Sequence, residues 1–293
     1  MSTPQNINCL TVRDKLRFYK KHPLSFAAFL LVCISAIVTV GILALLVGYI
    51  LVKGIPYLKP ELFAWEYNSE NVSMMPAIIN TFTMTGLTLL IAVPIGIGAA
   101  IYLVEYAGRG NKLVGLVRMT TETLAGIPSI VYGLFGYLIF VIALHFGRSM
   151  LSGALTLAIM ILPTIMRTTE EALKAVPDTY REGGFGLGAG RLRTVFRVVL
   201  PSAVPGILSG IILAIGRIVG ETAALIYTSG TVPGVPTSLM QSGRTLSVHM
   251  YALLSEGLYT DQAYATAVVL LVLVLLINAL AGWVAKRIQA DKG

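Results

Sequence analysis

The sequence has 293 residues, of which 56% are hydrophobic and only 12% are Asp, Glu, Lys or Arg, and its mean hydropathy is +0.79. A soluble domain carries about 25% charged residues, so this chain has too few charges to cover a globule of its size with a hydrated surface. The composition therefore excludes an ordinary soluble protein and a disordered one. A net charge of +8 would indicate nucleic-acid binding in a soluble chain, but here the charges must first be placed relative to a membrane.

Six uncharged or nearly uncharged runs are long enough to cross a hydrocarbon core, which takes roughly 20 residues. In chain order they cover residues 24–52, 75–104, 123–144, 150–166, 202–227 and 263–285. The first run is longer than the apolar core of a secretory signal, which has about 7–15 residues, so we expect it to be retained as a helix. These runs predict an all-α integral membrane protein with six transmembrane helices.

The basic residues predict the orientation of these helices. Of the 22 Lys and Arg residues, 17 fall in the N-terminal segment and in the connections after the second, fourth and sixth runs, whereas the other connections hold only four. Because basic residues accumulate on the cytoplasmic side, both termini are expected there. The expected parts are a cytoplasmic segment (1–23), the first helix and an external loop (24–74), a five-helix transmembrane domain (75–285) and a cytoplasmic tail (286–293). This one-sided distribution accounts for the positive charge without a nucleic-acid partner.

The longest cytoplasmic connection, residues 167–200, contains acid, glycine and proline at fixed spacings. Glu182, Gly183 and Gly184 are followed after three residues by Gly188, and after nine more by Val198-Val199-Leu200-Pro201. A phosphate-binding loop is excluded, because no Lys-Ser or Lys-Thr pair follows the last glycine and no strand pattern precedes it. The spacing resembles the E-A-A-x3-G-x9-I-x-L-P loop of ABC importer permeases. The two glycines at the alanine positions weaken a helix by about 0.8–1.0 kcal/mol each, but they allow close approach of another surface.

Three further blocks narrow this resemblance. They read AGIPSIVYGLFG at 125–136, LPTIMRTTEEAL at 162–173 and GRIVGETA at 216–223, and they are similar to phosphate importer permeases of the PstA family. The resemblance covers roughly residues 75–285. It implies the type I ABC importer permease fold, a place in the bacterial cytoplasmic (inner) membrane, and ATP-driven import of inorganic phosphate by alternating access.

The resemblance also implies partners. The homologous permease PstC would form a heterodimer with this chain. Two copies of the ATPase PstB would lie below, and the loop from Glu182 to Gly190 would couple to the ATPase. Leu200 and Pro201 complete the matched motif. The phosphate-binding protein PstS would deliver phosphate from outside. The chain itself has no nucleotide-binding segment, so we expect a transport subunit without a cofactor or enzymatic activity.

Arg217 and Glu221 are the only ionisable residues deep in a predicted span. Each costs about 2.5–3.5 kcal/mol at a helix centre, so intramembrane charge is usually functional. Residues four apart share one helix face, so the two side chains are expected to touch. A guanidinium matches phosphate oxygens with two hydrogen bonds, and Thr222 adds a hydroxyl. We therefore expect Arg217, Glu221 and Thr222 to line a transient phosphate path; the alternative is an internal ion pair that locks the helix to a neighbour.

Other interpretations stay open at this stage. The chain could be a permease for another oxyanion, such as molybdate or sulfate. Only the resemblance of the block at 216–223 to phosphate permeases argues against this. A membrane enzyme needs a nucleophile, a base or a metal set, but His22, His145 and His249 are far apart and Cys33 stands alone. An ion channel needs a repeated filter-like segment, which this sequence lacks, and the long, patterned cytoplasmic loop would have no purpose in a channel. The charges at Arg118, Glu122 and Arg167 are interpreted as interfacial, and the amphipathic run 246–258 as a short external helix.

Overall fold

The computed structural model describes residues 23–108 and 111–290, and the chain divides into two units, residues 1–52 and 53–293. The predicted N-terminal segment therefore lies almost wholly outside the described residues, as does the end of the predicted tail. The first unit contains most of helix α2 (Pro23–Gly54). Large apolar side chains are exposed all around this helix, from Leu24 to Val52. A helix that is hydrophobic on every side is suited to lipid or to a partner helix rather than to a surface in water.

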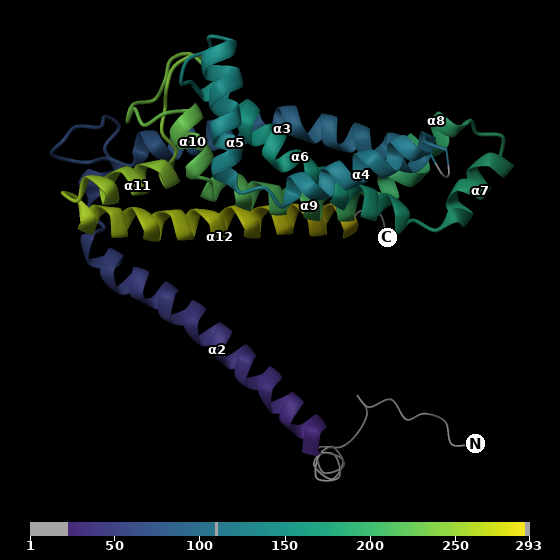
Figure 1. The fold of residues 1–293 in the computed structure, drawn as a ribbon, viewed down its shortest axis with the longest axis horizontal. Coiled ribbons are helices and arrows are strands. Elements are labelled where there is room, and N and C mark those ends of the chain that lie inside the picture. Colours follow the sequence, from purple (N-terminus) through teal and green to yellow (C-terminus); the bar gives the residue numbers. More distant parts are fainter. Residues whose placement is uncertain (1–22, 109–110, 291–293) are drawn as a thin grey trace. The chain divides into compact units, whose positions relative to one another are not determined.

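The second unit is a helical bundle, and the described residues contain no strand. Four long helices run side by side: α3 (Met75–Ile101), α6 (Met150–Lys174), α9 (Leu200–Gly220) and α12 (Thr260–Ala290) (Figure 1). The short helices α7 (Asp178–Gly186) and α8 (Arg191–Thr194) lie at one end of the bundle. Helix α11 (Leu246–Glu256) lies at the other end (Figure 1), so a short helix does form over most of the run 246–258.

The third predicted span is not one straight helix. The chain forms α4 (Lys112–Ala125) and α5 (Ser129–Gly136), which continues as a π turn (Tyr137–Ala143), and the two parts are bent by 105°. Pro128 causes the break, because proline lacks an amide proton and keeps the preceding residue out of the helical conformation. The hydroxyl of Tyr132 donates to the Leu124 carbonyl at 2.8 Å and so satisfies one group freed by the break. Within residues 23–108 and 111–290, five helices are long and apolar enough to span a membrane, and this bent pair makes a sixth candidate.

Helix α6 lies at the centre of the hydrophobic core. Its buried residues Leu157 and Ile161 pack with Met84 of α3, Ile218 of α9 and Leu225 of the short helix α10 (Ala223–Thr228). Glycines on three neighbouring segments face α6 side chains: Gly96 faces Ile165, Gly136 faces Thr156 and Gly210 faces Thr168. Small residues let membrane helices approach closely, which explains how α6 is surrounded. By contrast, α12 exposes a row of leucines (Leu275, Leu276 and Leu280) on its outer side.

Candidate functional site

Arg217 lies in the last turn of α9, which ends at Gly220. The next residue, Glu221, has an extended backbone (φ −72°, ψ 128°), so the two residues do not share a helix face. The expected contact between them is therefore wrong: no ion pair within 4.0 Å joins them in the described part of the chain. Instead, the buried Glu221 carboxylate accepts a hydrogen bond from the Ala224 amide at 3.1 Å and caps α10. The Thr222 hydroxyl donates to the Gly220 carbonyl at 3.4 Å.

The break after α9 packs against the other broken helix. Gly133 of α5 faces Ala224 of α10 so closely that a Cβ on Gly133 would lie 2.8 Å from the Ala224 Cα. Only glycine permits this approach without a shift of backbone. Irregular backbone at membrane depth is tolerated where it is buried in protein or lines a water-filled cavity. The two breaks therefore mark the region of the bundle in which a path is expected.

A cavity of about 500 Å³ lies next to Arg217 between α4, α6 and α9. It has room for an oxyanion with hydration water, since one water occupies about 30 Å³ of liquid. Neither Glu221 nor Thr222 is among its lining residues, so of the three expected pathway residues only Arg217 lines it. The charged side chains on its wall are Arg118, Glu122, Arg167, Glu170, Glu171, Lys174 and Arg217.

The basic side chains of this cavity are paired, with one exception. Glu170 lies 2.6 Å from both Arg118 and Lys174, and it links α4 to α6. Arg167 pairs with Glu171 at 3.1 Å. Among the described residues, no carboxylate lies within 4.0 Å of Arg217. Arg217 is thus the basic group of the cavity whose guanidinium is free to bind an anion with two hydrogen bonds.

A second hollow of about 530 Å³ lies on another side of α9 and also reaches Arg217. Its polar lining comes from Thr164, Ser209 and the side-chain amide of Asn278 on α12. Asn278 is an isolated amide in an apolar helix, and no motif of the sequence predicts its position beside Arg217. Arg118, Glu122 and Arg167, which were expected as interfacial charges, are brought by the fold to the same cavity as Arg217.

The loop expected to couple to an ATPase folds as α7, followed by a turn. Glu182, Gly183 and Gly184 are all helical, and the Glu182 side chain is exposed. A Cβ on Gly184 would lie 2.8 Å from the Thr194 Cγ2, whereas one on Gly183 would meet nothing within 4 Å. The close approach expected of the glycines is therefore made by Gly184 alone, and it joins α7 to α8.

Gly188 ends α7 in a left-handed conformation, with φ +78°. Its amide donates to the Phe185 carbonyl at 2.9 Å, and the Ala189 amide donates to the Gly184 carbonyl at 3.0 Å. These two bonds form a Schellman motif, in which glycine is preferred because it carries no Cβ. Beyond it, Leu200 and Pro201 begin α9 after a π turn (Val195–Val199). Proline fits the first turn of a helix.

Arg181 ties α7 to the rest of the bundle. Its Nη2 lies 2.7 Å from Oε1 of Glu105, which follows α3, and both side chains are largely buried. The guanidinium also donates to the carbonyls of Val176 at 2.8 Å and Leu173 at 2.9 Å, at the end of α6. The hydrogen bond with Glu105 raises the pKa of Arg181 above its ordinary value. No sequence pattern predicts this pair, because its partners are 76 residues apart.

The outer side of this loop carries exposed apolar side chains. Tyr180 and Phe185 are each 49% exposed, and Leu187 is 91% exposed. Apolar residues exposed together beside an anchored helix are typical of a protein interface.

Comparisons with known proteins place this geometry in context. Residues 92–290 match the family described as binding-protein-dependent transport system inner membrane component. The chain is 33% identical over 273 residues to a probable ABC transporter permease, YqgI, of Bacillus subtilis (87% of this chain, 92% of that protein). It is 31% identical over 274 residues to the phosphate transport system permease PstA of Haemophilus influenzae (92% and 96%). It is also similar in fold to a bacterial ABC transporter involved in the import of alginate (TM-score 0.66, 19% identity, 94% and 99% covered).

Proposed function

The chain belongs to the family of binding-protein-dependent transport system inner membrane components, and from this premise we propose that it is a permease subunit of an ATP-driven importer of inorganic phosphate. Relatives named as phosphate transport permeases support the substrate, among them PstA of Haemophilus influenzae and a PstC of Mesorhizobium japonicum that is 33% identical over 270 residues. The chain is a multi-pass protein of the bacterial inner membrane. A molybdate or sulfate permease is less favoured, because the PstA and PstC relatives are named for phosphate transport.

The unpaired Arg217 is the observation that carries the proposed path. A divalent oxyanion crossing the membrane needs donors that replace its hydration, and Arg217 offers a guanidinium at the wall of both hollows. A site in a transport path must not hold its substrate tightly, because the substrate has to leave. One guanidinium beside a hollow with room for water fits this requirement. Glu221 would act indirectly, by fixing the break after α9, and Thr222 would lie beside the path.

The paired charges of the cavity suggest how phosphate leaves. With the α7 end on the cytoplasmic side, as the basic residues of the connections indicate, an anion released from Arg217 meets Arg118, Arg167 and Lys174. Each of these is already held by Glu170 or Glu171. Pre-formed ion pairs reduce the affinity of these bases for a passing anion, so the exit is steered by charge without a strong second site.

The exposed side of α7 suggests how ATP hydrolysis is coupled to transport. The permease pairs with a homologous permease and works with a substrate-binding protein; we assign these partners, more finely, as PstC and PstS, and the ATPase as two copies of PstB. Tyr180, Phe185 and Leu187 would enter the ATPase surface, with Glu182 at the rim. Arg181 would then transmit the movement of α7 to α3 and α6 through its bonds to Glu105 and the α6 carbonyls.

The substrate is tested by uptake into proteoliposomes that contain the assembled complex, loaded binding protein outside and ATP inside. Radiolabelled phosphate should accumulate, and excess unlabelled sulfate or molybdate should not compete. Accumulation of sulfate or molybdate in place of phosphate would contradict the substrate assignment.

The coupling role is tested by co-purification. Gly188→Asp places a side chain at φ +78° and should abolish co-purification of the ATPase. Gly190→Ala is the matched control, because Gly190 has an ordinary φ of −68° and a Cβ there meets nothing within 4 Å. Equal ATPase recovery with both variants would refute the role of this turn.

A further inference from the structure

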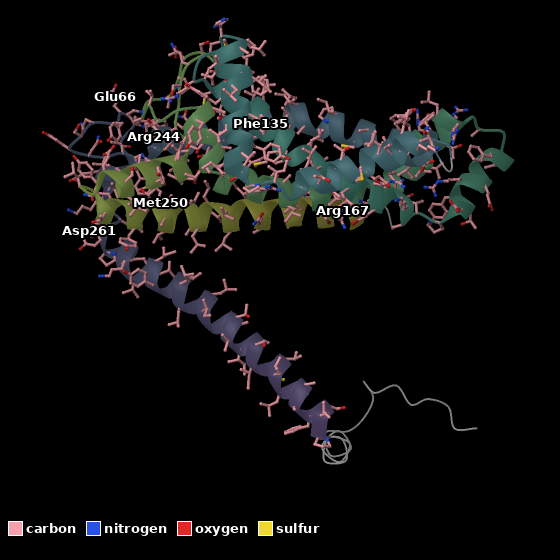
Figure 2. The ribbon with its side chains drawn as sticks, viewed as in Figure 1. Glu66, Phe135, Arg167, Arg244, Met250 and Asp261 are labelled. Carbon is pink, nitrogen blue, oxygen red and sulfur yellow. The ribbon has the colours of Figure 1, made fainter. Side chains whose placement is uncertain are left out.

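A buried cluster at the α11 end of the second unit contains two side chains, Arg244 and His249, with buried nitrogen atoms that make no hydrogen bond. Arg244 is 4% exposed and His249 is 0% exposed. The Arg244 guanidinium carbon lies 4.7 Å from the centre of the Tyr67 ring, and this ring meets the His249 ring edge-on at 6.2 Å. Figure 2 labels Arg244 near α11, away from Arg167 at the wall of the cavity. The cluster is therefore separate from the site described above.

The polar atoms of the cluster are unsatisfied. Nε and Nη2 of Arg244 and both ring nitrogens of His249 are buried without a hydrogen bond, and in the described part of the chain no carboxylate lies within 4.0 Å of Arg244. Buried polar groups are nearly always paired, so each exception needs an explanation, such as an ion. Burial and the nearby Arg244 lower the pKa of His249 to about 3. The histidine is thus neutral, and the guanidinium has no compensating charge.

The missing partner cannot be another subunit in this conformation. The unsatisfied atoms are covered by this chain alone, so a side chain from outside has no access to them. The backbone around Arg244 is fixed, since its amide donates to the Val232 carbonyl at 3.0 Å and its carbonyl accepts from Asn80 Nδ2 at 3.1 Å. The backbone of Arg244 is thus held in place, while Nε and Nη2 of its side chain are left free for a small ligand that enters when the surrounding segments separate.

Polar groups connect this cluster with the break after α9. The Thr245 and Ser247 hydroxyls are 3.1 Å apart, and the Ser247 hydroxyl donates to the Glu221 carbonyl at 2.6 Å. Glu221 comes directly after the helix that carries Arg217. A ligand held at Arg244 would therefore stand at the α11 end of a polar line that reaches the break after α9, directly beyond the helix that carries Arg217.

We propose that Arg244 and His249 form a second oxyanion site, closed in this conformation, which receives the transported anion on the α11 side before it reaches Arg217. The inference rests on the proposed function. The guanidinium would bind two phosphate oxygens, and the neutral imidazole would exchange a hydrogen bond with a third. The Tyr67 ring face holds the guanidinium while the site is empty. Alternating access would open this site while the cavity at the other end closes.

Arg244→Met separates this role from a structural one. In the assembled complex, phosphate uptake should fall by roughly tenfold or more, as expected for loss of a charged hydrogen-bond donor. The melting temperature should not fall, because the variant removes an unpaired buried charge. Arg148→Met is the matched control, since Arg148 also stacks on a tyrosine, Tyr137, but is exposed. Unchanged uptake in Arg244→Met, or a lowered melting temperature that accounts for its loss, would overturn the proposal.

A second measurement uses the native complex. Carbethoxylation of His249, read by peptide mass spectrometry, should be slow in the resting complex and fast in the complex trapped with ATP and vanadate, and phosphate should slow it again. The exposed His145 is the internal control that reacts in both states. Equal protection of His249 in every state, or reactivity that no oxyanion slows, would contradict the second site. If sulfate or molybdate protects His249 and is also transported, the second site stands and only the proposed substrate falls.

Discussion

Replacing Arg181 by methionine should destabilise the folded permease by about 3–5 kcal/mol, because it leaves a buried carboxylate without its partner. The Glu105 side chain is 7% exposed and the Arg181 side chain 15% exposed, and the two lie 2.7 Å apart. The change also removes the donors to the carbonyls of Leu173, in the last turn of α6, and of Val176, just beyond that helix. We therefore expect the upper part of this range.

Two companion variants dissect this value. Glu105→Gln keeps an acceptor for the guanidinium and should cost only about 1.5–3 kcal/mol, as for loss of a charge-assisted hydrogen bond. The double variant Arg181→Met with Glu105→Leu should recover part of the loss, since a buried ion pair replaced by apolar side chains is often neutral. Together the two variants separate the net contribution of the ion pair to stability from the cost of leaving Glu105 buried without a partner.

The measurement is the free energy of unfolding of the purified permease in mixed detergent micelles. Arg167→Met is the matched control, because Arg167 and Glu171 form an ion pair with both side chains 63% exposed. Such an exposed pair contributes about 0.3–0.5 kcal/mol. The assignment of Arg181 as the anchor of α7 fails if Arg181→Met destabilises the protein no more than Arg167→Met does.

Three further predictions concern stability in the same micelle assay. Gly183→Ala should stabilise α7 by up to about 1 kcal/mol, because alanine has the higher helix propensity. Gly184→Ala should destabilise α7, because the added Cβ would lie 2.8 Å from the Thr194 side chain. Equal effects of the two substitutions would contradict the packing of α7 on α8. Gly188→Ala should cost about 1–2 kcal/mol, because its φ is +78°, and a neutral result would show that the turn relaxes. The pKa of His249 is about 3, below its ordinary value of 6.5. The unfolded state therefore binds the extra proton between these values, so stability present above pH 6.5 is lost as the pH falls, by about 1.4 kcal/mol at pH 5.5. His249→Gln should remove this part of the pH dependence, and an unchanged pH profile would show that His249 is not its source.

The hydrophobic runs predicted most of the fold because a membrane span has a minimum apolar length. Runs 75–104 and 150–166 correspond to α3 and α6. Helix α6 continues beyond its apolar run, through charged residues, as far as Lys174. Pro128 marks an interruption of the third uncharged run in the sequence, but nothing in that run gives the size of the bend. Hydropathy does not distinguish a straight helix from two helices bent by 105°.

The sequence predicted single residues of the candidate site but not the contacts between them. Arg217 stands out because charge at membrane depth is rare. Its expected contact with Glu221 assumed a continuous helix, and no residue type at positions 218–222 forbids one; the end of α9 depends on tertiary contacts such as Gly133 against Ala224. The pair of Arg181 with Glu105 was invisible for the related reason that spacing along the chain carries no information on contacts between distant segments.

Phosphate passes Arg217 in the proposed path, and uptake by an Arg217→Gln complex tests this step most directly. The variant should assemble with its partners, and its phosphate uptake should be roughly 10- to 150-fold lower. This is the effect of losing a charged hydrogen-bond donor that contributes about 1.5–3 kcal/mol. Arg287→Gln, which removes an exposed arginine stacked on Trp283, should transport normally. Undiminished phosphate uptake by a fully assembled Arg217→Gln complex would contradict the account.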